Sequence, residues 1–308
     1  MTLAVFADGV ENPANLDRIA DAAHLIGATR AQTISGRLIA IENSRGARSV
    51  YGRNPLNKAA TIAVGNERRG LSPRILERAD ETLAIPTMSR TISTLNVAAA
   101  AAVAGWYVVR GSASQAFAAR PEHRRPTLLI VGDDHVEVGS TLRSAAAFGF
   151  HDVLLEDRDA GWFEGTAAAR REARAAARRH KNPLRIHRAD LRSAMRFEEI
   201  VLVSAFGPAP PLRREPLNRG QRQLVVIGAT LDEVSNVAAD RLRVATLGLV
   251  PMEHAPLRLV ASIALAEIAR RSDAVGRRRV VQRRDRRHTR LHWSWRLRAR
   301  RDSLMRLS

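Results

Sequence analysis

The sequence predicts an α/β protein made of two tandem units, each with a mostly parallel sheet flanked by helices, followed by a basic tail. Two observations lead to this fold class. Short apolar runs that end at turn residues alternate with stretches of helical spacing, which is typical of parallel sheets. The same order of elements then restarts after Pro126, and a period this long indicates tandem domains and not a solenoid.

The 308 residues are long enough for two domains that each bury a core. The candidate linker lies between Gly111 and Pro126, where small and polar residues are followed by Arg-Pro-Glu-His-Arg-Arg-Pro. We therefore divide the chain into a first unit (1–115), a linker (116–126), a second unit (127–272) and a basic tail (273–308).

The first unit begins with a strand from Leu3 to Phe6. Apolar residues at helical spacing then predict a helix from about Leu16 to Leu25, capped by Asn15 or its neighbour. Before Gly65 the chain has room for one strand, Thr33 to Ile41, and a polar loop (42–57).

The next stretch contains a strand from Ala60 to Val64 that leads into the turn Gly65-Asn66-Glu67. Ser72-Pro73 is typical of a helix start. A short strand from Thr82 to Ile85 stops at Pro86. Leu95 to Val109 is apolar on all faces except Asn96, which predicts a helix buried all round.

In the second unit, Thr127 to Asp159 repeats the order strand, turn, helix and strand. The segments Leu224 to Glu233 and Leu247 to Ala269 then correspond to the turn and the buried helix of the first unit. Between Gly149 and Gly228 there are about forty more residues than in the matching interval of the first unit. This interval has room for a further helix and strand.

Composition narrows the classes of function. The chain has no cysteine, and its nine His show no metal spacing, so we expect neither disulfides nor a bound metal. The longest apolar run, Val97 to Val109, is too short to span a bilayer, and the N-terminus does not have the layout of a signal peptide. We therefore expect a cytoplasmic protein with no membrane partner.

The net charge is +19 and the isoelectric point about 11.6. Arg270 to Ser308 holds fifteen Arg against three Asp. A surplus of this size favours a polyanionic partner, by default a nucleic acid, although a solvated tail without a partner stays open. A second basic stretch, Ala169 to His180, is predicted to be a helix with Arg170, Arg174 and Arg178 on one face. It could follow phosphates or be an ordinary solvated face.

Two motifs carry a family resemblance. AVGNERRGLSP (Ala63 to Pro73) and AIPTMSRTISTLNVAAAAA (Ala84 to Ala102) resemble motifs 2 and 3 of the SpoU/TrmH family, the RNA 2′-O-ribose methyltransferases of the SPOUT class. The resemblance implies a trefoil α/β knot that holds S-adenosylmethionine, and a structured RNA, tRNA or rRNA, as partner and substrate. A knot would be an exception to the rule that chains do not thread loops.

Motif 1 of the family is divided between the two units. Phe6 to Ala28 resembles it, but Asp17 stands at the glycine position and Asp21 at the arginine position. When the units are aligned on Gly27 and Gly149, Gly139 and Arg143 fall on these two positions. The second unit in turn has Gly228-Ala229-Thr230 in place of GNE, and Pro256-Leu257-Arg258-Leu259 in place of T-LNV.

These losses are complementary. Proteins of the family are homodimers whose motif 1 helices face the partner's knot, so the resemblance implies an internal pseudo-dimer with one composite site. Further association of two chains stays open. The alternative is that the second unit decayed after duplication and retained Arg143 by chance.

The resemblance implies a role for each site residue. Arg143 would contact the RNA phosphate and activate the hydroxyl of Thr94, for which Ser93 is a neighbouring alternative. Glu67 would orient the arginine or the ribose, and Asn96 would brace the loops. The residues implied for the cofactor are Gly65, Asn66, Glu67, Gly70, Ile85, Pro86, Thr94 and Leu95.

The resulting hypothesis is methyl transfer from S-adenosylmethionine to a ribose 2′-hydroxyl of RNA. One alternative is a non-catalytic RNA-binding or assembly protein on the same scaffold, motivated by Asp21, Thr94 and the short first unit. Another is a methyltransferase that acts on a protein or a small molecule. Transfer of labelled methyl to RNA, and nuclease sensitivity of the product, would separate the three.

Overall fold

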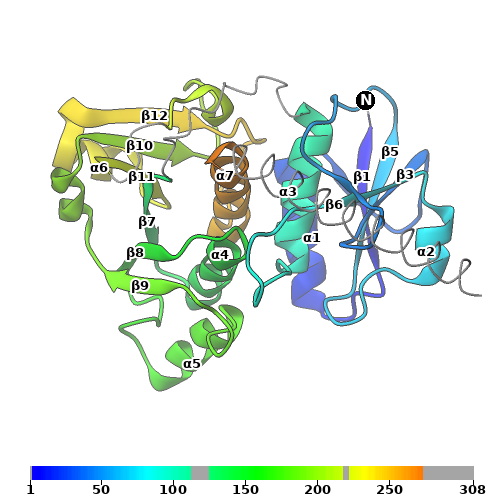
Figure 1. Cartoon of the computed structure of the whole chain (residues 1–308), viewed down its shortest axis with the longest axis horizontal. Helices are drawn as coiled ribbons and strands as arrows, with labels where there is room; N and C mark the ends of the chain where they lie inside the picture. The colour runs from blue at the N-terminus through cyan, green and yellow to red at the C-terminus, as the bar shows by residue number, and fades with distance from the viewer. Residues whose placement is uncertain (1, 112–124, 218–221, 273–308) are drawn as a thin grey trace, which may run out of the picture.

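The computed structural model describes residues 2–111, 125–217 and 222–272, and it contains two six-stranded sheets with helices between and outside them (Figure 1). In these ranges every strand pair of the two sheets is parallel. The prediction of two tandem α/β units with mostly parallel sheets is confirmed. Most of the predicted linker (116–126) and all of the predicted tail (273–308) lie outside the described residues.

The first unit contains nine elements. In chain order these are β1 (Leu3–Asp8), α1 (Pro13–Leu25), β2 (Thr29–Ala31), β3 (Arg37–Ile41), β4 (Arg48–Ser49), β5 (Ala60–Gly65), α2 (Pro73–Arg78), β6 (Glu81–Ala84) and α3 (Val97–Arg110).

The second unit has a longer series, in which η marks a short 3₁₀ helix. In chain order these are β7 (Thr127–Gly132), α4 (His135–Ala147), β8 (Asp152–Asp157), α5 (Ala167–Ala176), β9 (Arg185–Arg188), η1 (Leu191–Arg196), β10 (Glu199–Ser204), η2 (Leu212–Arg214), β11 (Gln223–Ile227), α6 (Leu231–Ala238), η4 (Ala239–Arg241), β12 (Leu242–Thr246) and α7 (Leu257–Ser272). The additional helix α5 and strand β9 are the pair predicted from the longer interval.

The two sheets share one strand order. The first sheet runs β2-β1-β5-β3-β6-β4, and the second, taken from its β9 edge, runs β9-β8-β7-β11-β10-β12. Five positions correspond, with β1 matching β7, β5 matching β11 and β6 matching β12. Each sheet then adds one strand of its own, β4 in the first and β9 in the second.

Four helices, α1, α3, α4 and α7, lie between the two sheets (Figure 1). They join the inner faces of both sheets into one apolar core that includes residues of both units. The outer face of the first sheet is covered by α2, and that of the second by α6 and η1. Strand residues alternate between the layers: Ile39 and Ile41 face the shared core, whereas Leu38 and Ala40 face α2. Among the described residues, no helix combines the length and the apolarity needed to cross a bilayer.

Some predicted boundaries were wrong in the first unit. Helix α1 begins at Pro13 and not near Leu16, because Asn12 caps it by accepting a hydrogen bond from the Ala14 N–H (3.0 Å). Proline at the first helical position has a suitable φ and lacks only a donor that would be unpaired there. The predicted strand Thr33 to Ile41 is shorter, and β4 forms within the loop that was expected to be irregular (42–57).

Two backbone hydrogen bonds join the units in an approximately two-fold arrangement. The Val250 N–H donates to the Leu25 carbonyl, and the Met88 N–H donates to the Ala147 carbonyl, both at 2.8 Å. Leu25 and Ala147 occupy equivalent positions at the ends of α1 and α4. Met88 and Val250 likewise each lie four residues after the corresponding strands, β6 and β12. The repeated contact supports an internal pseudo-dimer.

A buried polar cluster also joins the units. The Tyr107 hydroxyl of α3 donates to Glu267 Oε2 of α7 at 2.6 Å, and Arg270 Nε donates to the same oxygen at 2.9 Å. Burial, followed by the negative charge of Glu267, raises the pKa of Tyr107 well above its usual 10. The hydroxyl therefore stays protonated and acts as a donor across the interface.

We expect Tyr107→Phe to lower the free energy of unfolding by about 1–3 kcal/mol, the usual cost when a buried hydrogen-bonding group loses its partner. Urea unfolding followed by circular dichroism measures this change. In a double-mutant cycle with Glu267→Gln, the two effects should not add, because the residues share one contact. Additive effects would contradict the coupling across the interface.

Candidate active site

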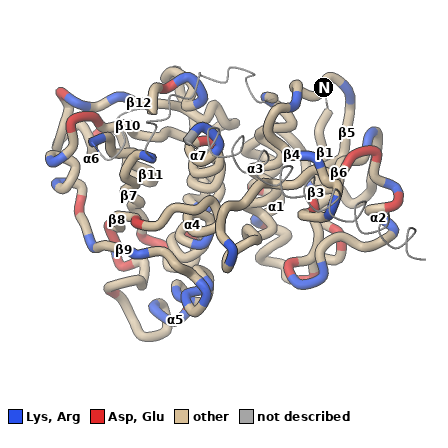
Figure 2. Tube along the Cα trace, in the orientation of Figure 1, with Lys and Arg blue, Asp and Glu red and all other residues tan. Residues whose placement is uncertain are grey.

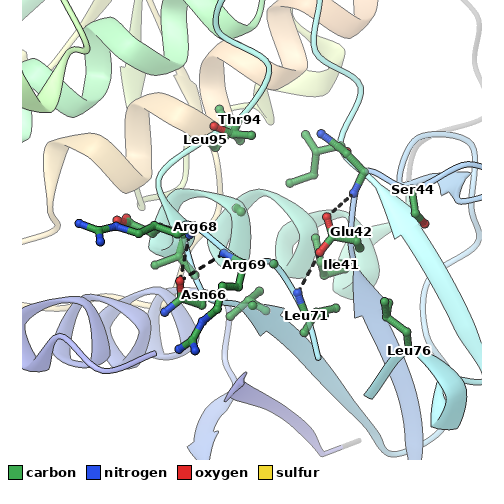
Figure 3. Close-up of a pocket in the computed structure, with 18 of the residues that line it drawn as sticks. Ile41, Glu42, Ser44, Asn66, Arg68, Arg69, Leu71, Leu76, Thr94 and Leu95 are labelled. Atoms are coloured by element: carbon green, nitrogen blue, oxygen red, sulfur yellow. Dashed lines mark hydrogen bonds between the residues drawn. The ribbon is translucent and has the colours of Figure 1, made fainter. Parts of the chain in front are cut away.

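A cavity of about 520 Å³ lies at the carboxyl ends of β3, β5 and β6 in the first unit (Figure 3). Ligands of open parallel sheets bind at this edge. Most of the predicted cofactor residues line the cavity: Gly65, Asn66, Glu67, Gly70, Ile85, Thr94 and Leu95. Pro86 does not line it, although its neighbours Ile85 and Thr87 do.

The turn after β5 forms one wall. Two backbone hydrogen bonds between Asn66 and Gly70, of 3.0 and 2.8 Å, close it. The Asn66 side chain accepts from the Arg68 N–H (2.9 Å) and donates to the Gly9 carbonyl (2.8 Å). A Cβ on Gly65 would lie 2.2 Å from the Gly70 carbonyl carbon, and Gly70 has φ +70°. The turn therefore requires glycine at both ends.

Two carboxylates that the sequence did not identify support this wall. Glu42, directly after β3, accepts a hydrogen bond from the Leu71 N–H at 3.0 Å and also lines the cavity. Asp8, at the end of β1, accepts from the Ser72 N–H at 2.6 Å and thereby holds the start of α2. The available signal was an acidic residue at the end of each buried strand.

Asn96 connects the turn to α3. Its side-chain oxygen accepts from the Ala98 N–H at 3.0 Å and caps the helix, while its amide donates to Glu67 Oε1, also at 3.0 Å. The hydrogen bond that Glu67 makes thus goes to Asn96 and not to Arg143. Within this geometry Glu67 and Asn96 brace the cavity together.

Arg143 reaches the cavity rim from the other unit. It lies on α4, yet its Nε donates to the Thr94 carbonyl (3.1 Å), and its Nη2 donates to the Thr94 hydroxyl (3.0 Å) and the Leu95 carbonyl (2.9 Å). Arg143 is only 6% exposed and does not line the cavity itself, whereas Thr94 and Leu95 do. The two residues implied for catalysis, distant in the sequence, are therefore in contact.

The charge of Arg143 lacks a carboxylate counter-ion. In the described ranges it forms no salt bridge, and its partners are carbonyl and hydroxyl oxygens. Burial, and next the charge of Arg178, lower the pKa of Arg143 to about 10, whereas Glu67 acts in the opposite direction. Because this value is still well above 7, the guanidinium is charged at neutral pH. A buried cation of this kind is suited to an anionic ligand or a developing negative charge.

The second unit has a cavity of about 970 Å³ at the equivalent sheet edge. Pro256, at the position of Thr94, offers no hydroxyl there. Arg258, at the position of Asn96, is 1% exposed, and its Nε donates to Glu137 Oε1 at 2.6 Å. Asp21 takes the place of Arg143, and burial, followed by Asp17, raises its pKa. The second cavity thus lacks both groups that meet at the first. Within the described ranges, no group of three His, Asp or Glu side chains is placed to hold a metal ion.

Residues 29–106 match the model of the SpoU rRNA Methylase family. The first unit is of the SpoU/TrmH type. The match begins after motif 1 and ends in α3, so it covers the cavity, the glycine turn and the Asn96 cap, and it confirms the predicted resemblance. The implied knot stays a prediction.

Solved structures with distant similarity carry related names. A TrmH-family protein from Porphyromonas gingivalis is 21% identical, with 36% of this chain and 60% of that chain covered and a TM-score of 0.31, so this chain spans less than two thirds of its length. The TrmH/SpoU tRNA modifying enzyme of A. aeolicus is 14% identical (50% and 80% covered, TM-score 0.36). The SpoU methyltransferase AviRb of Streptomyces viridochromogenes, in complex with AdoMet, is 12% identical (85% and 88% covered, TM-score 0.36). No protein with a curated description matches the chain.

We expect Asn96→Ala in this SpoU-type unit to cost more stability than a helix cap alone. Loss of a cap costs about 0.5–2 kcal/mol, and Asn96 also holds Glu67. The matched control is Asn12→Ala, which removes the same kind of cap from α1 at an exposed position. Urea unfolding of both variants measures the difference, and equal losses would contradict a bracing role for Asn96.

Proposed function

We propose that this chain transfers a methyl group from S-adenosylmethionine to a ribose 2′-hydroxyl of a structured RNA, tRNA or rRNA, at one composite site. The observation that carries the proposal is the contact between Arg143 of the second unit and Thr94 of the first, at the rim of the SpoU-type cavity. The family match and the strongly basic composition support RNA as the substrate. A cytoplasmic location agrees with this role.

The cavity fits the cofactor. Its volume of about 520 Å³ falls in the range usual for small-molecule sites, roughly 300–1,000 Å³. Its walls include the loops that follow three parallel strands, with glycine where the turn closes. The residues that would hold the cofactor are Gly65, Asn66, Glu67, Gly70, Ile85, Thr94 and Leu95, with Pro86 setting the direction of the chain after Ile85. When bound, the cofactor supplies an electrophilic methyl group.

The protein must position the ribose hydroxyl and favour loss of its proton. Arg143 Nη2 donates to Thr94 Oγ1 and so occupies one accepting lone pair of this hydroxyl. Within the described residues the hydroxyl hydrogen has no acceptor, so it can donate to a ribose oxygen. The positive charge of Arg143, held in a buried site, stabilises negative charge that develops on that oxygen or on the adjacent phosphate. Thr94 thus orients the hydroxyl, and Arg143 supplies the charge.

A non-catalytic RNA-binding protein is the second candidate, favoured by Asp21 at the motif 1 arginine position and by threonine in place of serine at Thr94. Transfer of tritiated methyl to bulk RNA by the purified chain separates the two. A nuclease-resistant labelled product would instead point to another methyl acceptor.

We expect Arg143→Ala to reduce methyl transfer by about 100-fold or more, the usual effect of removing a group that stabilises developing charge. Affinity for S-adenosylhomocysteine should stay nearly unchanged, because Arg143 does not line the cavity. Asp21→Arg is the control and should give no gain in methyl transfer. Asp21 lies on α1, the counterpart of α4, so an arginine there would serve the second cavity, where Pro256 replaces Thr94. An Arg143→Ala protein with normal turnover would eliminate the composite site.

We expect one cofactor site per chain, located in the first unit. Leu95→Trp should block it by filling the cavity, whereas Leu257→Trp, the equivalent change in the second cavity, should leave it intact. Calorimetry with S-adenosylhomocysteine gives both the stoichiometry and the effect of each variant. Two sites of similar affinity, or loss of binding in the Leu257 variant alone, would contradict the assignment.

A further inference from the structure

Helix α5 and the turn after it exist only in the second unit among the described elements, and they pack closely on α4 beside Arg143. The contact depends on Gly139. A Cβ there would lie 2.3 Å from the Ala173 carbonyl oxygen and 2.8 Å from the Ala176 Cβ. Glycine at this position lets the α5 backbone approach α4 one helical turn before Arg143.

The turn that follows α5, residues 177–182, is attached to α4 by a buried amide. Asn182 is 6% exposed, and its Nδ2 donates to the Ala177 carbonyl at 2.9 Å and to the Leu142 carbonyl at 3.4 Å. Its Oδ1 accepts from the Leu184 N–H at 3.0 Å. The turn is therefore held at the residue that precedes Arg143.

Arg178 occupies this turn in an unfavourable backbone conformation. Its φ is +51°, in the left-handed region that residues other than glycine rarely adopt. The prediction that Arg178 shares a helix face with Arg170 and Arg174 was wrong, because α5 ends at Ala176 and Arg178 lies in the turn that follows. Strain of this kind persists where the surroundings enforce it, and it points to a function.

Neither Arg178 nor Arg143 forms a salt bridge with a carboxylate of the described residues. In the described part of the chain, the Arg178 guanidinium has no hydrogen bond or ion pair, and its charge acts directly on Arg143. Such a pair repels itself unless an anion joins it. A phosphate can accept hydrogen bonds from two guanidinium groups at once, which makes it a suitable counter-ion.

The positive surface continues outward from this pair. Between residues 170 and 181 there are six Arg and Lys against one acidic residue, Glu172, which is paired with His135 at 2.8 Å. Arg171, Arg174 and Lys181 are exposed. Figure 2 shows basic positions gathered on α5, at the lower edge of the second unit. We call residues 170–181 the α5 basic surface.

We propose that the α5 basic surface binds the phosphate backbone of the RNA substrate, with Arg178 and Arg143 sharing one phosphate beside the composite site. This rests on the proposed function, because Arg143 links the surface to the cavity in which the methyl group would be transferred. RNA is favoured over an acidic protein because regularly spaced phosphates suit a row of exposed arginines that leads to the half-buried Arg178 and the buried Arg143.

The test is Arg178→Gly in the full chain. Glycine adopts the left-handed conformation without strain. The urea concentration at the midpoint of unfolding should therefore be equal to or higher than that of the parent protein. Affinity for fluorescein-labelled bulk tRNA, measured by anisotropy without cofactor, should fall about tenfold. The slope of log affinity against log salt should become shallower by about 1, the signature of one lost phosphate contact.

Two matched variants accompany it. Arg178→Lys keeps the charge and should retain the salt slope, whereas Arg192→Ala removes an exposed arginine of η1, on the other side of the second sheet, and should change nothing. Unchanged affinity and slope in Arg178→Gly would overturn the proposal, as would competition by polyglutamate equal to that by tRNA. Because binding is measured without methyl transfer, failure here is distinct from failure of the Arg143→Ala activity test.

Discussion

The structure depends on one apolar layer, the four helices α1, α3, α4 and α7 that both sheets share. Ala98, Ala101 and Ala102 of α3 are completely buried, and a Cβ on Gly105 would lie 2.0 Å from the Ile26 side chain. Small residues let these helices approach closely, and an exposed face of this size would be costly in a separate unit. The two units therefore share one hydrophobic core and do not form two independent domains.

This close packing determines which groups meet at the candidate site. Arg143 is buried within the layer and reaches Thr94 and Leu95 because α4 lies next to the loop that leads into α3. The first unit supplies the strand ends and the glycine turn, and the second supplies the cation. The equivalent position on α1 of the first unit holds Asp21. Only the second unit therefore contributes a cation to the cavity of the other unit.

Much of this was predictable from the sequence. The turn at Gly65 and the Asn96 helix start follow from local motifs. The pairing of Arg143 with Thr94 was implied by the family resemblance together with the internal repeat. Glu42 was not predicted, because an acidic residue after a strand shows no partner until the fold brings the Leu71 N–H to it.

The position of Arg178 could not be predicted either. Helical periodicity continues through the sequence to this residue, but tertiary contacts end the helix at Ala176. Gly139 lets α5 approach α4 closely, Asn182 holds the following turn against α4, and both contacts are long-range. Periodicity along the chain does not show such contacts, and here they determine where the helix ends.

The crossing of Arg143 into the other unit also has a consequence for how the protein responds to dilution. A site assembled from two separate chains disappears when the concentration falls below the dissociation constant of the dimer. In this protein both contributors belong to one chain, so their encounter is intramolecular and independent of the number of molecules in solution. In the composite site that we propose, a single copy of the chain therefore supplies both Arg143 and the loop that carries Thr94.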